Sequence, residues 1–269
     1  MFCFQCEQTA GGKGCMGKAG VCGKRAETAD HQDGLVGALI ALAQAAEKNP
    51  SAVSETTHQL ILDGLFTTVT NVSFNDDTIQ VIIDRTRAEK AQLGGAEILD
   101  YDMQKVWNGD EDIRSLKSLI LFGIKGMAAY AYHAHVLGYT DAGMQQFFYK
   151  ALAAIGNDEF GMNELLPIVL EVGEVNLTCM ALLDRANTET YGTPEPTEVT
   201  LTVEKGPFIV VTGHDLYDLK QLLEQTKEKG VNIYTHGEML PAHGYPELKK
   251  YAHLKGNFGT AWQNQQKEF

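Results

Sequence analysis

Four of the five cysteines in this 269-residue chain lie near its start, at Cys3, Cys6, Cys15 and Cys22. Two, eight and six residues separate them in turn, and the intervening segments are rich in glycine. A segment of this composition is expected to be an irregular loop that buries no hydrophobic core of its own. A bound metal can replace such a core, because the free energy of ligation contributes directly to folding. The sequence therefore predicts a metal-binding loop over residues 1–24.

The spacing of the cysteines bears on which metal they bind. Two cysteines separated by two residues can bind one metal centre from a single turn, while the glycines let the backbone curl around a bulky cluster and direct amide N–H groups toward its sulfurs. Lys13, Lys18 and Lys24 would offset the negative charge of the thiolates. Structural zinc sites usually pair two Cys-x2–4-Cys units, and only one such unit occurs here. The pattern thus favours an iron–sulfur site over a zinc-bound structural domain, and either of these over disulfides.

Charge and hydropathy limit the partners and the compartment. The formal net charge is −13, and an acidic surface repels nucleic-acid phosphates and anionic membranes. The most apolar run, residues 35–46, is too short to cross a bilayer, and the N-terminus does not have the pattern of a secretory signal. We therefore expect a cytoplasmic protein that binds neither nucleic acid nor membrane. In the cytoplasm, clustered cysteines indicate metal more than disulfides.

Most of the chain has the hydrophobic period of helices. Residues 25–195 are expected to form a helical-bundle domain, because helix follows helix with short joints. Residues 94–111 are expected to connect two of these helices. The predicted helices cover residues 26–49, 55–69, 77–92, 112–137, 142–155 and 163–186.

The pattern changes after residues 187–200, which contain Thr-Pro-Glu-Pro-Thr and are a candidate linker. A strand at 207–212, a helix at 215–229 and a strand at 231–235 form a βαβ unit, which requires a parallel sheet. One such unit is too small for a sheet that must be covered on both faces, so residues 200–269 are expected to be an incomplete α/β domain. The expected fold is mainly α, with an N-terminal Fe–S loop and two helical bundles, followed by the start of an α/β parallel-sheet domain.

A histidine and a glutamate follow the two predicted strands. His214 comes just after the first strand and Glu238 just after the second, so both should emerge at the same edge of the sheet. Imidazole and carboxylate are a sensible partial ligand set for iron. A helix N-cap and a plain turn would explain the same residues, and spacing alone favours that structural explanation. His236 and His243 flank the same loop and compete with His214 as candidate ligands.

Short motifs spread over the whole chain form a specific combination. Together they closely resemble the motifs of the hybrid-cluster proteins, the hydroxylamine reductase or prismane family, and the group from Gly213 onward is the most specific. The matching segments are Met1-Phe-Cys-Phe-Gln-Cys-Glu-Gln-Thr9, Gly14-Cys15, Gly20-Val-Cys-Gly-Lys24, Thr70-Asn-Val-Ser-Phe74, Gly123-Ile-Lys-Gly-Met-Ala-Ala-Tyr130, His133-Ala-His-Val-Leu-Gly138, Gly213-His-Asp-Leu216, Tyr234-Thr-His-Gly-Glu-Met-Leu-Pro-Ala-His-Gly-Tyr-Pro-Glu247 and Trp262-Gln-Asn-Gln265.

The resemblance implies a helical first domain of two bundles followed by two α/β domains. It implies that the four N-terminal cysteines hold a [4Fe–4S] cluster, or a [2Fe–2S] cluster as in members with wider spacing. The close spacing resembles the [4Fe–4S] kind, although the last gap is one residue longer than that class has. It also implies a second, hybrid [4Fe–2O–2S] cluster with His214 and Glu238 among its ligands, which reverses the preference for a structural explanation of these two residues.

The remaining hybrid-cluster ligands of the family, several cysteines and another glutamate, lie further along the chain. This sequence stops before them, and Cys179 does not match a ligand position. The chain therefore resembles the N-terminal portion only, and by itself it is expected to be inactive.

The function implied by the resemblance is reduction of hydroxylamine to ammonia, or of nitric oxide to nitrous oxide, under nitrosative stress. Its partners would be the small nitrogen-oxide substrate and an electron-donor protein or reductase. The alternative is a non-catalytic electron-transfer or cluster-binding module, since the chain could hold one cluster and half of a second site. No residue is singled out as catalytic.

Overall fold

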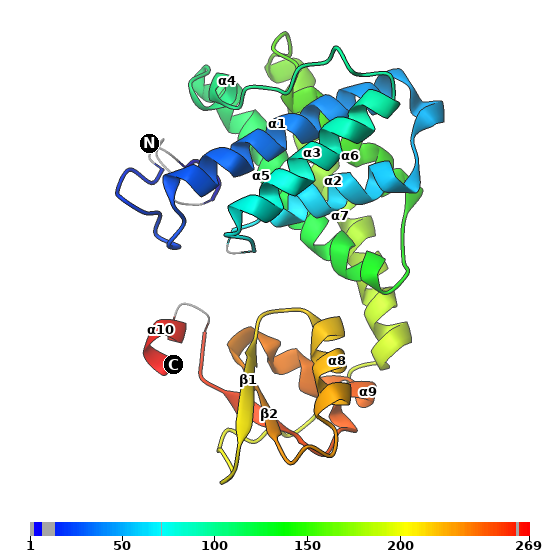
Figure 1. Cartoon of the computed structure of the whole chain (residues 1–269). Coiled ribbons are helices and arrows are strands. Elements are labelled where there is room, and N and C mark those ends of the chain that lie inside the picture. The colour runs from blue at the N-terminus through cyan, green and yellow to red at the C-terminus, as the bar shows by residue number, and fades with distance from the viewer. Residues whose placement is uncertain (1–2, 7–13, 71, 262–263) are drawn as a thin grey trace. The chain divides into compact units, whose positions relative to one another are not determined.

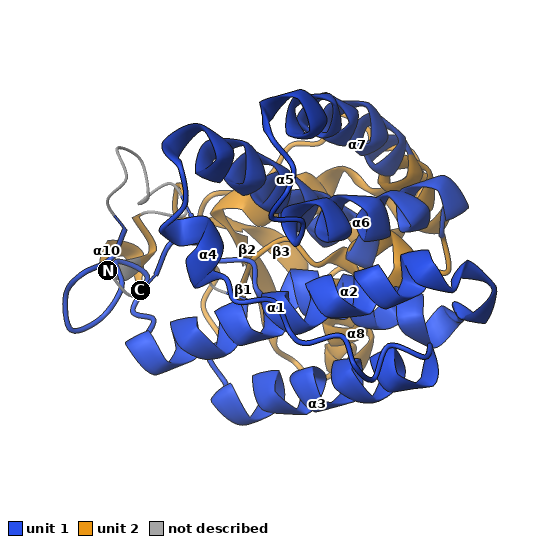
Figure 2. Cartoon of the chain, turned by 90° about the horizontal axis from the view of Figure 1, so that it is seen from above, with its two compact units in different colours: residues 1–132, 140–181 blue, residues 133–139, 182–269 orange. Residues whose placement is uncertain are grey.

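The computed structural model describes residues 3–6, 14–70, 72–261 and 264–269 (Figure 1). Outside these described residues lie Lys13 and several residues of the motifs above, namely Met1, Phe2, Glu7, Gln8, Thr9, Asn71, Trp262 and Gln263. The chain divides into two compact units (Figure 2). The first, here the helical unit, comprises residues 1–132 and 140–181, and the second, the sheet unit, comprises residues 133–139 and 182–269. The predicted order, a mainly helical fold followed by a parallel sheet, is confirmed.

The helical unit is built around α1 (Ala26–Lys48), whose residues 35–43 are all buried. This run of leucine, isoleucine, valine, alanine and glycine leaves no polar face, as expected for a helix surrounded by protein. The helices that pack on α1 are α2 (Glu55–Thr67), α3 (Asp76–Gln92) and α6 (Ala142–Ile155). Two short elements follow α1 and α3 respectively, η2 (Pro50–Ala52) and α4 (Gln104–Trp107).

Side-chain caps explain where several helices begin. Ser54 forms a capping box at the start of α2, in which its hydroxyl accepts from the Thr57 amide and the Thr57 hydroxyl accepts from the Ser54 amide. Asn75 caps α3 and Asp141 caps α6 in the same way, each accepting a backbone N–H three residues on. Such caps satisfy amides that have no partner inside the helix.

Two long helices contribute residues to both units, α5 (Glu111–Val136) and α7 (Met162–Tyr191). α7 continues five residues beyond its predicted end and stops before Gly192, which has φ +86°. By length and composition alone, α7 is the one helix among the described residues that could cross a membrane, with 28% of its most apolar window buried. The expectation that no apolar run is long enough is therefore wrong for α7 on these two criteria.

The sheet unit contains three parallel strands in the order β1 (Phe208–Thr212), β2 (Asn232–His236) and β3 (Leu254–Phe258). The predicted βαβ unit is confirmed, with α8 (Leu216–Thr226) as its helix. β3 was not predicted, because Leu-Lys-Gly-Asn-Phe lacks the β-branched residues typical of strands. The remaining elements of the unit are η3 (Gly237–Gly244), α9 (Pro246–Lys249) and α10 (Gln265–Glu268).

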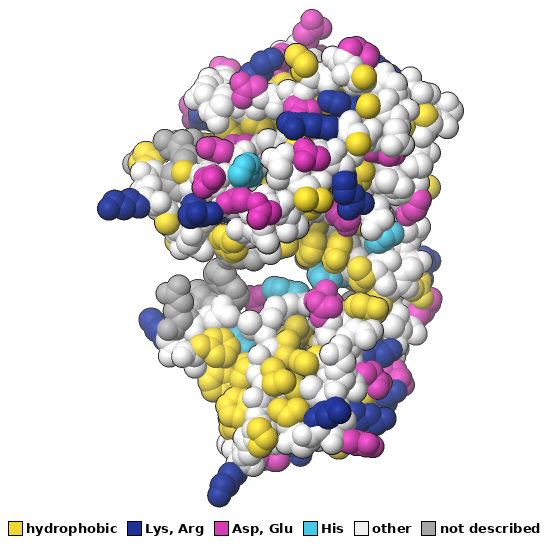
Figure 3. All heavy atoms as spheres, in the orientation of Figure 1, with side chains coloured by type: hydrophobic (Ala, Val, Ile, Leu, Met, Phe, Trp, Pro, Cys, Tyr) yellow, Lys and Arg dark blue, Asp and Glu magenta, His cyan; other side chains and the backbone are white. Residues whose placement is uncertain are grey.

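Burial in the sheet unit is uneven. Its core forms around Tyr191, Leu219, Leu223 and Ile233, all of which are fully or almost fully buried. β1, by contrast, is an edge strand whose side chains are exposed or half-buried. Figure 3 shows hydrophobic side chains gathered on the surface of the sheet unit. The exposed hydrophobic residues on and just before β1 are Leu201, Val203, Phe208 and Ile209.

Candidate metal centre

The turn between Cys3 and Cys6 is fixed to the helical unit by the two residues inside it. Phe4 is buried and its ring stacks on that of Trp107, with 5.0 Å between ring centroids. Gln5 is also buried, and its Nε2 donates to Asp33 Oδ1 at 2.7 Å. Phe4 and Gln5 thus hold the Cys-x2-Cys turn against α4 and α1, leaving the two cysteines half-buried at its ends.

The other two cysteines meet beside Gly20. A Cβ added to Gly20 would lie 3.6 Å from the Sγ atoms of both Cys15 and Cys22, so both thiols border the space that the missing side chain leaves. The Cys15 amide also donates to the Cys3 carbonyl oxygen at 3.2 Å, which joins the two halves of the loop. None of the four cysteines is joined in a disulfide. Thiols are the ligands that iron–sulfur groups use, so this donor set fits such a group.

The thiols do not surround a single point. Among the described residues, no group of three or more His, Cys, Asp or Glu side chains is close enough to hold one metal ion. A cluster differs from a single ion in this respect, since each cysteine of a [4Fe–4S] site binds a different iron atom.

Two buried lysines lie beside the cysteine loop. Lys24 and Lys125 are 2% and 4% exposed. Lys24 Nζ donates to Gln5 Oε1 at 3.3 Å and also to the side chain of Gln32. Burial raises the pKa of the Cys3 thiol, and the positive charge of Lys24 opposes this by favouring the thiolate. Of the three lysines singled out from the sequence, Lys24 is therefore placed to offset thiolate charge, while Lys18 is exposed.

Lys125, on α5, was missed by the sequence reasoning. Its Nζ is buried and has no hydrogen-bond partner among the described residues. Burial lowers the pKa of Lys125 to about 8. The negative charges of Asp33, Cys3 and Cys6 oppose this shift, and the positive charge of Lys24 adds to it. The sequence gives no indication of this proximity, because it arises from helix packing and not from spacing.

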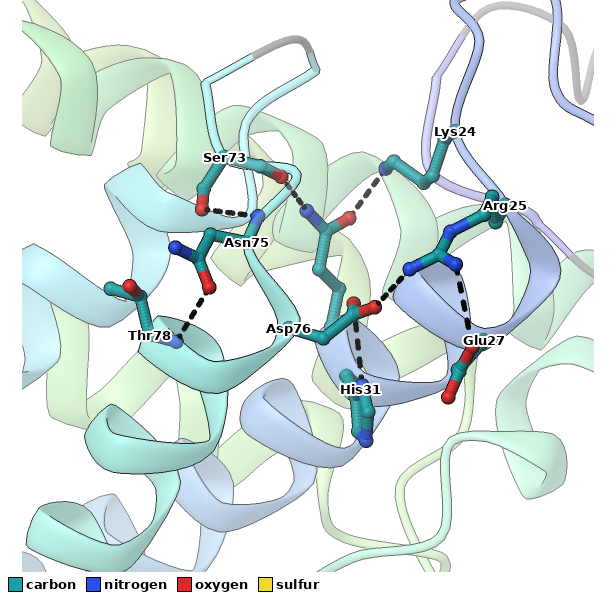
Figure 4. Close-up of polar contacts among 9 residues, drawn as sticks. Lys24, Arg25, Glu27, His31, Ser73, Asn75, Asp76 and Thr78 are labelled. Atoms are coloured by element: carbon teal, nitrogen blue, oxygen red, sulfur yellow. Dashed lines mark hydrogen bonds and ion pairs between the residues drawn. The ribbon is translucent and has the colours of Figure 1, made fainter.

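The end of the cysteine loop is also tied to the segment before α3 (Figure 4). Gln32 Oε1 accepts a hydrogen bond from the Lys24 ammonium, and Gln32 Nε2 donates to the Ser73 carbonyl oxygen at 3.0 Å. Arg25 pairs with Asp76, with 2.7 Å between Nη2 and Oδ2. The segment around Ser73 and Asp76 therefore holds the end of the loop in place.

The second predicted pair is brought together by the sheet. His214 Nε2 lies 2.6 Å from Glu238 Oε2, and the side chains are 65% and 50% exposed. Gly213 and Gly237, at φ +124° and +50°, turn the chain just after β1 and β2, which places both side chains at one edge of the sheet. The proximity expected from parallel strands is confirmed. Binding one metal through both atoms would require Nε2 to be free of its proton.

His236 and His243, the competing histidines, are engaged elsewhere. His236 is 1% exposed, and its two ring nitrogens lie 3.2 Å from Thr212 Oγ1 and 2.9 Å from Glu268 Oε2. His243 is buried, with Nε2 2.9 Å from Thr235 Oγ1, and burial lowers its pKa. Both are structural in this arrangement, which leaves His214 as the accessible imidazole of the loop.

Another histidine lies near His214. His133 has Nδ1 3.6 Å from Asp215 Oδ2, and burial lowers its pKa. His133, His214 and Tyr191 line a small cavity of about 60 Å³, and the buried Tyr191 hydroxyl has no hydrogen-bond partner within the described part of the chain. Because His133 belongs to α5, far from the strands in sequence, spacing could not reveal this contact.

Cys179, the fifth cysteine, is a core residue. It is fully buried on α7, its Sγ contacts the Met127 carbonyl oxygen at 3.4 Å, and burial raises the pKa of its thiol to about 12. A thiol of this kind is a poor metal ligand, because metals bind the thiolate.

Comparison with known proteins gives a consistent result. The sequence matches the Prismane/CO dehydrogenase family over residues 1–269. It is 46% identical over 300 residues to a hydroxylamine reductase of Methanocella arvoryzae, and 48% identical over 295 residues to one of Solidesulfovibrio magneticus; each alignment covers 100% of this chain and 55% of the relative. A third, from Acetivibrio thermocellus, is 44% identical over 292 residues, covering 100% of this chain and 54% of the relative. The chain thus spans about half the length of the curated relatives it matches.

Proposed function

Because the chain belongs to the Prismane/CO dehydrogenase family, we propose that it forms part of an iron–sulfur enzyme of the hybrid-cluster type that reduces hydroxylamine. The observation that carries the proposal is the cysteine loop, in which the thiols of Cys15 and Cys22 meet beside Gly20 and two buried lysines lie close by. The proposal includes a cytoplasmic location, a role under nitrosative stress and an electron-donor protein as partner.

In this proposal, the cluster is held by Cys3, Cys6, Cys15 and Cys22. A [4Fe–4S] cluster, with [2Fe–2S] as the alternative, would supply one-electron transfer when bound. The protein contributes four thiolates, the nearby Lys24 charge, and a turn whose geometry is fixed by Phe4 and Gln5.

His214 and Glu238 are proposed to supply part of the ligand set of a hybrid [4Fe–2O–2S] cluster, completed by ligands outside this sequence. Such a cluster would supply electrons and a Lewis acid for the nitrogen substrate. The reduction consumes two electrons and two protons per hydroxylamine and yields ammonia and water. Nitric oxide is the alternative substrate, two molecules of which, with two electrons and two protons, give nitrous oxide and water.

A second candidate function is a non-catalytic electron-transfer or cluster-binding module. It is favoured by one observation, that no third metal-ligating side chain joins His214 and Glu238 in the part of the chain that the structure describes. In that case the 269 residues would hold the N-terminal cluster and turn over no substrate.

Anaerobic iron and sulfide analysis of the reconstituted chain tests both candidates. About four irons per chain, or about two for a [2Fe–2S] cluster, together with colour and a paramagnetic signal on reduction, are expected. Cys6→Ser and Cys22→Ser should lose most of the iron, while Cys179→Ser, which changes a cysteine outside the loop, should keep it. A colourless zinc protein would overturn the proposal, and about eight irons would show that the second site is already complete.

The enzymatic part of the proposal requires the longer protein in which this sequence occurs. There, Glu238→Gln should abolish hydroxylamine turnover but keep the paramagnetic signal of the N-terminal cluster. Glu247→Gln is a matched control, because Glu247 is an exposed carboxylate paired with Lys250 on α9. Equal activity of Glu238→Gln and the unaltered protein would exclude Glu238 as a ligand.

A further inference from the structure

Lys125 differs from Lys24, the other lysine beside the cysteine loop. Lys24 donates to Gln5 and Gln32 and so helps to hold the loop in place. Lys125 is just as inaccessible, yet its Nζ has no hydrogen-bond partner among the described residues. No bond seen in the structure would be broken by replacing Lys125 with an uncharged residue of similar length.

Asp33 is the acid whose charge acts most strongly on Lys125, but the two residues do not form an ion pair. Asp33 uses Oδ1 to accept from Gln5 Nε2 at 2.7 Å and Oδ2 to accept from Trp107 Nε1 at 2.9 Å. Burial raises the pKa of Asp33, which weakens it further as a counter-ion. The other negative groups that act on Lys125 are Cys3 and Cys6. A buried ammonium without a partner is costly, so its persistence indicates compensation by charge on the cysteine side.

We infer that Lys125 supplies a buried positive charge that stabilises the reduced form of the N-terminal cluster and so raises its reduction potential. The inference rests on the proposed function, because it requires a cluster on Cys3 and Cys6. Reduction adds one negative charge to a cluster that already carries four thiolates. A fixed cation nearby, in a medium that screens charge poorly, favours the form that holds the extra electron.

In this inference, Lys125 acts on the cluster only through its charge, so it is not a catalytic residue. Its burial also predicts that added salt will screen its influence only weakly. Lys117 is a matched control on the same helix. It is likewise 4% exposed, but its Nζ donates to the Asn157 carbonyl oxygen at 3.0 Å and lies 3.8 Å from Asp158, so its charge is already compensated.

The test is potentiometric titration of the reconstituted chain, followed by its paramagnetic signal. Lys125→Met is expected to make cluster reduction about tenfold less favourable, which is about 59 mV lower in potential for one electron. Lys125→Arg should stay close to the unaltered protein, and Lys117→Met should leave the potential unchanged. The shift in Lys125→Met should persist at high salt.

Thermal unfolding of the metal-free chain gives a readout that does not depend on the cluster. Lys117→Met should be less stable, because it removes the hydrogen bond to the Asn157 carbonyl oxygen and the ion pair with Asp158. Lys125→Met should be as stable as the unaltered chain or more so, because it removes an unpaired buried charge. A clear loss of stability in Lys125→Met would show that the lysine has a structural partner, and would overturn the inference.

The outcomes separate this inference from the proposed function. Absence of iron and sulfide in the unaltered chain would overturn the cluster and the role of Lys125 together. A normal cluster whose potential is the same in Lys125→Met and in the unaltered chain would overturn the role of Lys125 alone. A lowered potential in Lys125→Met with none in Lys117→Met would support both.

Discussion

Four lysines are buried among the described residues of the helical unit: Lys24, Lys90, Lys117 and Lys125. The first three donate to carbonyl, amide or carboxylate oxygens, and Lys90, for example, lies 3.0 Å from Asp100 Oδ1. The Nζ of Lys125, by contrast, has no hydrogen-bond partner among the described residues, and burying an ammonium in this way costs stability. At the residue scale, the missing partner is therefore more informative than the contacts that are made.

His58 provides a prediction on pH at the same scale. Its Nδ1 is hydrogen-bonded to the Tyr149 hydroxyl, and burial raises the pKa of Tyr149, so the tyrosine is the donor and the imidazole the acceptor. Burial also lowers the pKa of His58 from its ordinary value of 6.5. The unfolded chain therefore binds the proton more readily than the folded one, and stability is full above pH 6.5 and falls as the pH drops below it.

Thermal unfolding between about pH 7.5 and pH 5.5 tests this sign. The unaltered chain should lose more stability over the interval than His58→Gln, which cannot gain the proton. His135→Gln is the control, because it removes a histidine that lies outside this contact. Equal pH dependence of the unaltered chain and His58→Gln would contradict the assignment.

Sequence reasoning could place His214 and Glu238 but not Lys125 or His133. The first pair follows consecutive parallel strands, whose ends must meet at one edge of the sheet, so topology alone brings the residues together. Lys125 and His133 reach their neighbours through the packing of α5, and no local pattern encodes which face of a long helix meets which loop. The sequence could thus identify candidate ligands that follow the strands, but not the charged side chains that helix packing brings close to the candidate sites.

Gly37 shows how closely the elements of the helical unit approach one another. The Gly37 carbonyl oxygen accepts from the Tyr101 amide at 3.1 Å, and a Cβ on Gly37 would lie 2.2 Å from the Tyr101 carbonyl oxygen. Gly37→Ala is expected to destabilise the chain by about 1–3 kcal/mol, because backbone atoms would have to move apart. Denaturant unfolding measures this difference.

Gly173→Ala is the matched control for that substitution. Gly173 also lies inside a helix, α7, but it is exposed and an added Cβ would meet nothing within 4 Å. Alanine there should stabilise the chain by about 0.5–1 kcal/mol through helix propensity. Destabilisation by both substitutions to the same extent would show that the approach of Tyr101 to Gly37 is not the cause.

At the element scale, most helices could be predicted from hydrophobic period, which indicated the bodies of α1, α2, α3, α5 and α6. In the structure, polar caps such as Ser54 and Asp141 lie at the starts of several of them. β3 was missed because its position depends on pairing with β2 and not on its own residues. α7 was underestimated because its last turns pack into the sheet unit around Tyr191, a tertiary effect.

At the scale of the whole molecule, the sheet unit leaves hydrophobic surface exposed. The chain spans about half the length of its curated relatives, and β1 is an edge strand whose Phe208 and Ile209 are 49% and 38% exposed. An edge strand with exposed hydrophobic side chains is a site of association between chains.

We therefore predict that the 269-residue chain self-associates through β1. The double substitution Phe208→Lys with Ile209→Lys should weaken association by about tenfold, because charge on an edge strand opposes strand pairing and about 1.4 kcal/mol corresponds to that factor. Sedimentation velocity over a concentration series measures the change.

Leu99→Lys, at an 85% exposed leucine of the helical unit, adds a lysine elsewhere and should leave association unchanged. If Leu99→Lys weakened association equally, general charge repulsion would be the cause. If the unaltered chain were monomeric, the role of β1 would be refuted, since the exposed strand would then be insufficient to pair two chains.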